Sequence, residues 1–221
     1  MKKFKKALVL FLCAVLLVTG SVMGTLAYLT SQDTATNTFT VGEVAIDLWE
    51  HAVDADGKAT TEITQTGNAY DEIQPGLVYS KDPTVTVKAD SEDCYVRMLV
   101  DVTYLKEADV VLADHDYLNW FDWNAAWANG VLINTVKTDT HITRTYEFRY
   151  NTIVSEPASD FNLEPLFTEI SIPAMINNVE LATLEGLQMV ITAHAIQADG
   201  FTNADEAWNG FAVQQATNPN P

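Results

Sequence analysis

The chain has 221 residues, which is enough for one domain with its own hydrophobic core. It is strongly acidic, with 30 aspartates and glutamates against 12 lysines and arginines, and its formal net charge is −18. Because nucleic acids and anionic membrane surfaces attract positive charge, this composition argues against both as partners and favours a protein kept dispersed by self-repulsion.

The first 27 residues have the pattern of a secretory signal peptide. Four lysines precede an apolar run at residues 7–18, and small residues follow it. Thr25 and Ala27 suit the −3 and −1 positions of a cleavage site, so cleavage would make Tyr28 the new N-terminus. The alternative is a retained membrane anchor, which needs about 20 strongly apolar residues. Small and polar residues dilute the segment after residue 18, so we predict cleavage and a secreted protein.

Removal of the signal peptide changes both charge and cysteine content. It would take away four basic residues and no acidic one, leaving a net charge of −22. Divalent cations or acid could then change how such molecules associate. Cys94 would be the one remaining cysteine, which excludes an internal disulfide and suggests a small buried residue beside a strand.

Residues 28–40 are predicted to form a strand that is polar on both faces. Threonines occupy one face, and the other face reads Leu29, Ser31, Asp33, Ala35, Asn37, Phe39 and Val41. A strand with so few apolar anchors has a weakly specified register and can pair with the sheet edge of another molecule. We therefore interpret it as a donor strand; the alternative is a flexible leader.

Residues 41–213 are predicted to form an all-β domain, an antiparallel β-sandwich with short flanking helices. Apolar and polar side chains alternate along residues 96–104, and shorter stretches near residues 44–48 and 146–150 repeat the pattern. Turn sequences separate these runs, namely Asp56-Gly57, Gln74-Pro75-Gly76, Asn129-Gly130 and Glu185-Gly186. Strands bounded in this way favour an antiparallel sandwich over a parallel α/β sheet.

The C-terminal part adds a strand, a helix and a tail. Residues 187–198 are apolar on both faces, which is typical of a central strand covered on each side. Thr202, followed three residues later by Asp205, comes close to a capping box and predicts a short helix over residues 202–211. Residues 214–221 are polar and are predicted to be a disordered tail.

A tryptophan-rich segment, residues 114–130, has two interpretations. Trp120, Trp123 and Trp127 share one face if the segment is helical. Such a stripe is more often part of a core, but it could also form a platform for binding sugars.

The sequence offers little for a metal or a catalytic site. No two of the four histidines, His51, His115, His141 and His194, lie within four residues of each other, so the H-E-x-x-H pattern of zinc proteases is absent. Asp114 and Asp116 flank His115, and Asp54 and Asp56 lie in VDADGK, which lacks the distal glutamate of an EF-hand loop. The latter also suits a hairpin turn. We expect no cofactor, no dedicated metal site and no enzymatic activity.

Several stretches together resemble the TasA/camelysin family of secreted Gram-positive surface proteins. They are GTLAYLTSQDTATNTFTVGEVAIDLWE, IQPGLVYSKDPTVTVKADSEDCYVRMLV, YEFRYNTI, PLFTEISIP and ITAHAIQADGFTNADEAW, in order along the chain. The resemblance implies cleavage by a SipW-type signal peptidase and a jelly-roll-like sandwich. For TasA-like members it also implies head-to-tail assembly into extracellular biofilm-matrix fibres, in which the free N-terminal segment of one subunit is donated to the next.

These observations predict a secreted structural subunit of a matrix fibre, located in the extracellular matrix or at the cell surface. Its expected partners are other copies of itself, an accessory fibre subunit and the signal peptidase. Three alternatives remain, namely an accessory or anchoring subunit, a camelysin-like surface metalloprotease, and a carbohydrate-binding sandwich.

Overall fold

The computed structural model describes residues 43–70 and 73–217. The predicted signal peptide and donor strand fall outside this part of the chain. So do all the residues assigned to them, namely Thr25, Ala27, Tyr28, Leu29, Ser31, Asp33, Ala35, Asn37, Phe39 and Val41. Within the described residues, no helix combines the length and the apolar character needed to cross a membrane.

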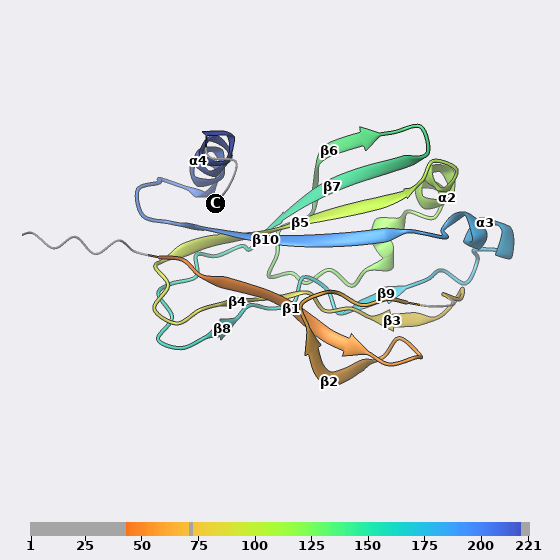
Figure 1. Ribbon diagram of the computed structural model, residues 1–221, viewed down its shortest axis with the longest axis horizontal. Helices are drawn as coiled ribbons and strands as arrows, with labels where there is room; N and C mark the ends of the chain where they lie inside the picture. Colours follow the sequence, from red (N-terminus) through yellow and green to blue (C-terminus); the bar gives the residue numbers. More distant parts are fainter. Residues whose placement is uncertain (1–42, 71–72, 218–221) are drawn as a thin grey trace, which may run out of the picture. The chain divides into compact units, whose positions relative to one another are not determined.

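The described domain is all-β, as predicted, and every strand pairing in it is antiparallel (Figure 1). One four-stranded sheet has the order β2-β1-β4-β8. Its strands are β1 (Ile46–Val53), β2 (Ala59–Thr64), β4 (Thr84–Val87) and β8 (Phe161–Asn162). The other four-stranded sheet has the order β10-β5-β7-β6. Its strands are β5 (Cys94–Leu105), β6 (Val131–Lys137), β7 (His141–Arg149) and β10 (Gln188–Gln197).

Short elements complete the domain. β3 (Val78–Ser80) and β9 (Glu169–Ser171) form a separate two-stranded sheet. The helical elements are α2 (Ala108–Asp114), the 3-10 turn η1 (Tyr117–Trp120), α3 (Asn178–Thr183) and α4 (Ala204–Thr217). Helices α2 and α3 lie together at one end of the sheets, and α4 lies toward the other end (Figure 1).

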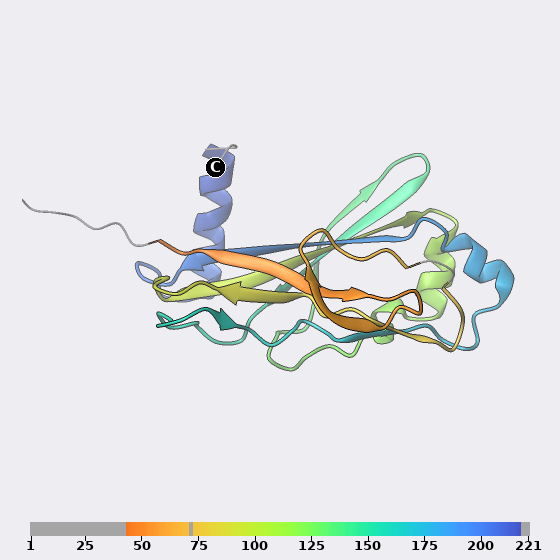
Figure 2. The same cartoon turned by 60° about the horizontal axis from the view of Figure 1, so that its bottom comes forward.

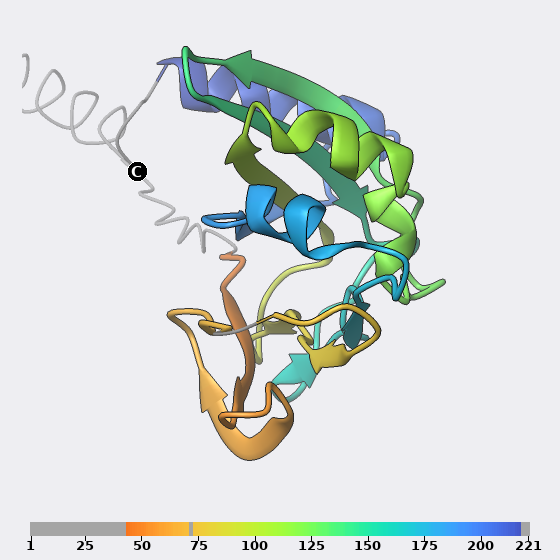
Figure 3. The same ribbon diagram turned by 90° about the vertical axis from the view of Figure 1, so that its right-hand side faces the viewer.

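The core lies between the two four-stranded sheets, which form separate layers (Figure 3). β5 shows the predicted alternation along its whole length, with buried residues at every second position from Cys94 to Tyr104. From the opposite sheet, Val85 and Val87 of β4 are fully buried in the same core. Burying these alternate apolar side chains is what holds the two layers together.

The prediction that residues 187–198 form a central strand is wrong. Among the described strands, β10 pairs with β5 alone and lies at the edge of its sheet. Its outer face is not uniformly covered, because Ile196 packs under α4 whereas Val190 is exposed. The apolar pattern on both faces therefore reflects the helix that covers one end of the strand.

The C-terminal helix is longer than predicted. α4 extends to Thr217, into the segment that was predicted to be a disordered tail, and residues 218–221 lie outside the described part. Its start also differs from the predicted capping box. Asn203 Oδ1 accepts a hydrogen bond from the Glu206 backbone N–H, and the Glu206 carboxylate bonds the backbone and hydroxyl of Thr202. Glu206, rather than Asp205, completes the cap.

Candidate functional site: a cleft beside the free edge of β10

A cleft of about 240 Å³ lies beside the first residues of β10. Its walls come from β1, the loop after β2, the segment before β4, and β10 itself. The lining residues are Leu48, Trp49, Glu50, Thr64, Gln65, Thr66, Gly67, Lys81, Pro83, Met189, Val190 and Ile191. The cleft thus lies where the edge of one sheet approaches the other sheet.

The backbone of β10 provides the first chemical feature of this cleft. β10 pairs with β5 over its full length, and no other described strand pairs with its second side. In an antiparallel pair, alternate residues direct their N–H and C=O groups away from the partner strand. These groups form a free hydrogen-bonding edge next to the cleft, which is a template for a further strand.

The side chains of β10 divide between the core and solvent at this point. Met189 and Ile191 are partly buried and pack against the core, whereas Val190 between them is 56% exposed. A strand placed along this edge would extend the sheet and cover apolar side chains that the domain leaves half-buried.

A buried ion pair provides the second feature. Lys81 Nζ lies 2.6 Å from Glu50 Oε2, and the two side chains are only 9% and 6% exposed. Burying two charges is costly unless they are paired and hydrogen-bonded. The second carboxylate oxygen, Glu50 Oε1, is buried and has no hydrogen-bond donor among the described residues. It can accept a hydrogen bond from an N–H or O–H group that enters the cleft.

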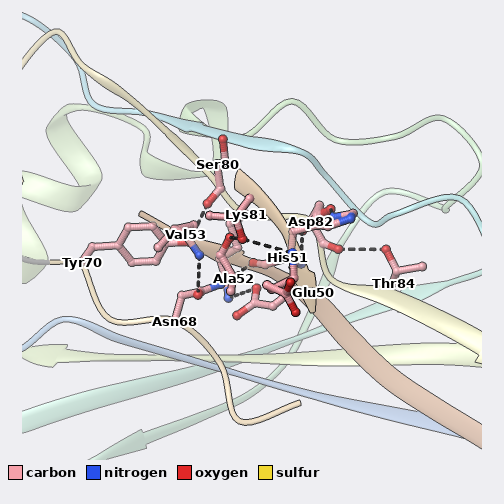
Figure 4. Close-up of polar contacts among 12 residues, drawn as sticks. Glu50, His51, Ala52, Val53, Asn68, Tyr70, Ser80, Lys81, Asp82 and Thr84 are labelled. Atoms are coloured by element: carbon pink, nitrogen blue, oxygen red, sulfur yellow. Dashed lines mark hydrogen bonds and ion pairs between the residues drawn. The ribbon is translucent and has the colours of Figure 1, made fainter. Parts of the chain in front are cut away.

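A polar network fixes β1 against the segment that precedes β4 (Figure 4). The His51 backbone N–H donates to Asp82 Oδ1 at 2.9 Å, and His51 Nδ1 lies 2.5 Å from Asp82 Oδ2. Asn68 holds the same strand from the other side, because its amide bonds the His51 carbonyl and accepts from the Val53 N–H. These contacts restrain β1 at His51 and the other segment at Asp82, which are the residues next to Glu50 and Lys81.

Tyr70 connects this network to β3. Its hydroxyl donates to the Ser80 carbonyl at 2.6 Å. Burial raises the pKa of Tyr70 well above its usual range, and the negative charges of Glu50 and Asp82 raise it further. The phenol therefore stays protonated and remains a donor.

The described histidines lie apart from one another. His51 contacts Asp82, His115 Nε2 lies 3.5 Å from Glu180 Oε2, His141 is exposed on β7, and His194 accepts from Arg97. Within the described ranges, no three histidine, cysteine, aspartate or glutamate side chains lie close enough together to hold a metal ion. In VDADGK, Asp54 Oδ1 accepts from the Asp56 and Lys58 backbone N–H groups, so this carboxylate stabilises a hairpin turn.

The three tryptophans of residues 114–130 pack in the core and do not form an exposed platform for sugars. Trp120 and Trp127 are buried, and each indole N–H donates to a backbone carbonyl. Trp123 is partly buried and stacks on Phe148, with ring centroids 4.5 Å apart. The segment is a 3-10 turn followed by extended chain, so the three indoles do not line one helical face.

Sequence reasoning missed the charged pair in the cleft. Glu50 continues the inward series of Val44, Ile46 and Leu48, so a carboxylate at that position was a sign of a buried partner. Lys81 gave no such sign, because it precedes β4 and lies 31 residues away. No known protein family, curated protein or solved structure matches this chain.

Proposed function

We propose that the protein is a secreted structural subunit of an extracellular fibre, in which the N-terminal strand of one copy is accepted by the cleft of the next. The observation that supports this most strongly is the free edge of β10 beside a cleft lined by half-buried apolar side chains. A strand added there gains main-chain hydrogen bonds from β10 and apolar contacts from the cleft.

The composition of residues 28–41 suits this cleft. The threonines at positions 30, 34, 36, 38 and 40 carry hydroxyl donors, and Glu50 Oε1 is a buried acceptor to which none of the described residues donates. Leu29, Ala35 and Phe39 supply apolar groups for contact with Met189 and Ile191. Specificity would thus come from a few side chains and affinity from the backbone.

The proposal includes the processing and the geometry of assembly. Removal of residues 1–27 by a signal peptidase frees the donor strand, so that processing starts assembly. Donation from one copy to the next is a heterologous contact, which does not close on itself and produces a filament. The sandwich has jelly-roll-like connectivity in this proposal, as the family resemblance implies.

Electron microscopy of two purified chains tests the role of the N-terminal strand. The chain that begins at Tyr28 should form filaments over a concentration series, and the chain that begins at Thr40 should not, because it lacks the donor strand. Filaments from the shorter chain would contradict donation.

A second pair of variants tests the cleft. Thr66 is exposed and lines the cleft, so Thr66→Trp should fill it and suppress filaments while leaving the fold intact. Thr61→Trp is the matched control, since Thr61 is exposed on β2 but does not line the cleft. If Thr66→Trp filaments match those of the parent chain, the cleft is not the acceptor.

A further inference from the structure

The other edge of the same sheet, strand β6, exposes an unusual amount of apolar surface. All seven of its residues are exposed. Four of them are large and apolar, namely Val131 at 59%, Leu132 at 48%, Ile133 at 49% and Val136 at 50% exposure. Single exposed apolar residues are ordinary, but a cluster along one strand is typical of an interaction surface.

β6 also has a free backbone edge. It pairs with β7 on one side, and no described strand pairs with its other side. The β6–β7 hairpin projects away from the opposite sheet (Figure 2), and although β7 has buried side chains, those of β6 are exposed. Leu132 illustrates this, because it lies opposite the buried Tyr146 and yet remains half-exposed.

The usual protections of an edge strand are nearly absent from β6. It contains no proline, its single charge is Lys137 at the end, and it is seven residues long. One irregularity in the pairing, between Leu132 and Asn134, is the only interruption. Exposed edge strands with these properties pair with strands of other molecules unless charges, proline, bulges or a covering element prevent it.

The charge of the chain favours a second copy at this edge. Copies with a net charge of −18 repel each other, and β6 contains no acidic residue. The adjoining strand β7 places Arg144 opposite Thr135 and Glu147 opposite Val131, and both charges are already paired, Arg144 with Asp109 and Glu147 with Arg97 and Arg149. Two copies can therefore approach along β6 with little like-charge repulsion.

We propose that β6 pairs with β6 of a second copy in antiparallel orientation, so that one sheet continues across both molecules. A twofold axis at Asn134 would place Leu132 of each copy opposite Val136 of the other, and Val131 opposite Lys137. Leu132 and Val136 would then cover each other, Val131 would lie against the aliphatic stem of Lys137, and Ile133 would lie opposite Thr135. Residues 28–41 fit this edge less well, because they are polar on both faces and leave the apolar groups of β6 uncovered.

This contact is separate from the strand donation proposed above. It uses neither the cleft nor the N-terminal segment, and it is isologous, so it joins two molecules side by side and then closes. It stands even if β10 accepts no strand. In a fibre it would join neighbouring filaments or double a single one.

Sedimentation equilibrium of the full chain tests the proposal. The parent chain should show a monomer–dimer equilibrium, and Ile133→Glu combined with Val136→Glu should raise its dissociation constant on the order of 100-fold, because four carboxylates would enter the interface between two acidic molecules. Val179→Glu is the matched control, since Val179 is an exposed apolar residue on α3, away from either edge, and this variant should dimerise like the parent. All the variants carry the same N-terminus as the parent.

A disulfide test locates the contact independently of the energetics. Asn134→Cys should form a covalent dimer on oxidation, whereas Thr61→Cys on the edge strand β2 should not. Both variants carry Cys13→Ser, and Cys94 does not interfere, because it is fully buried. The proposal is overturned if the parent stays monomeric up to about 1 mM, which corresponds to roughly 4 kcal/mol of association free energy. It is also overturned if the glutamates leave dimerisation unchanged, or if a peptide of residues 28–41, added before oxidation, prevents the Asn134→Cys cross-link from forming.

Discussion

The two edges of the second sheet, β10 and β6, differ in what surrounds them. β10 has a cleft and β1 on one side and α4 over part of its outer face. Among the described strands β6 pairs only with β7, and every residue in it is exposed. Both edges leave backbone groups free, but only the β10 edge is flanked by a cleft and a helix. The β10 edge can therefore select an incoming strand by its side chains, whereas the exposed β6 edge suits any strand of matching polarity.

The cover over β10 depends on a compact polar and aromatic contact. The guanidinium of Arg97 lies 4.3 Å from the Trp208 ring and pairs with Glu147 at 2.8 Å. Arg149 joins the same glutamate to Asp205 of α4. A cation against an aromatic face and paired charges together hold α4 on the sheet. No comparable arrangement exists at β6.

The largest expected effect is at the cleft beside β10. Lys81→Met removes one partner of a buried ion pair and leaves Glu50 uncompensated, so we expect a loss of about 3–5 kcal/mol in the free energy of unfolding. Lys81→Met combined with Glu50→Leu removes both charges and should recover most of that loss. Urea unfolding curves measure both. A single variant that loses less than about 1 kcal/mol would show that the pair is solvated.

The next effect concerns the start of the β6 hairpin. A Cβ atom at Gly130 would lie 2.5 Å from Cζ of Phe148, whose ring is buried and stacked on Trp123. We expect Gly130→Ala to cost about 1–3 kcal/mol, because the ring cannot move without disturbing the core. Asn129→Ala, at the exposed neighbouring position, is the control and should unfold at nearly the parent urea concentration. Equal midpoints for the two variants would contradict this geometry.

A smaller effect is the pH dependence of stability that His194 introduces on the outer face of β10. Burial lowers the pKa of His194, and the positive charge of Arg97 lowers it further. The unfolded chain therefore takes up a proton as the pH falls through about 6.5, while the folded chain takes it up only at lower pH. Stability should fall as the pH drops below that value. The loss should be smaller in His194→Gln, measured by unfolding at several pH values; identical slopes would exclude His194 as the cause.

The smallest effect is on β6 itself. Val131 is 59% exposed, so Val131→Thr should change the free energy of unfolding by less than about 0.5 kcal/mol. Thermal unfolding of the dilute chain would measure this. A larger loss would mean that β6 contributes to the core, and the contrast between the two edges would then disappear.

Local patterns predicted single strands well but not their neighbours. The alternation along residues 96–104 identified β5 and its buried face, because a strand's own period sets which side chains point inward. The apolar run at residues 187–198 identified a strand but misplaced it at the sheet centre. Position within a sheet depends on pairing between distant segments, which one strand's composition does not encode.

The same limit applies to the candidate site and to the helices. The pairing of Glu50 with Lys81 joins two elements through tertiary structure, so no spacing rule predicts it. Helix α3 was predictable, because Asn177 and Glu180 form a capping box within three residues. The donor residues predicted between Leu29 and Val41 remain a prediction, since they lie outside the described part of the chain.

The pairing of β10 with β5 also determines when the domain can fold. Gln197 lies opposite Cys94, so completing this sheet joins segments roughly a hundred residues apart, and such non-local pairing slows folding to milliseconds or longer. β10 also follows β5, β6 and β7 in the chain, so it is the last strand of this sheet to be synthesised. A growing polypeptide therefore cannot complete the sheet until residues 188–197 have emerged.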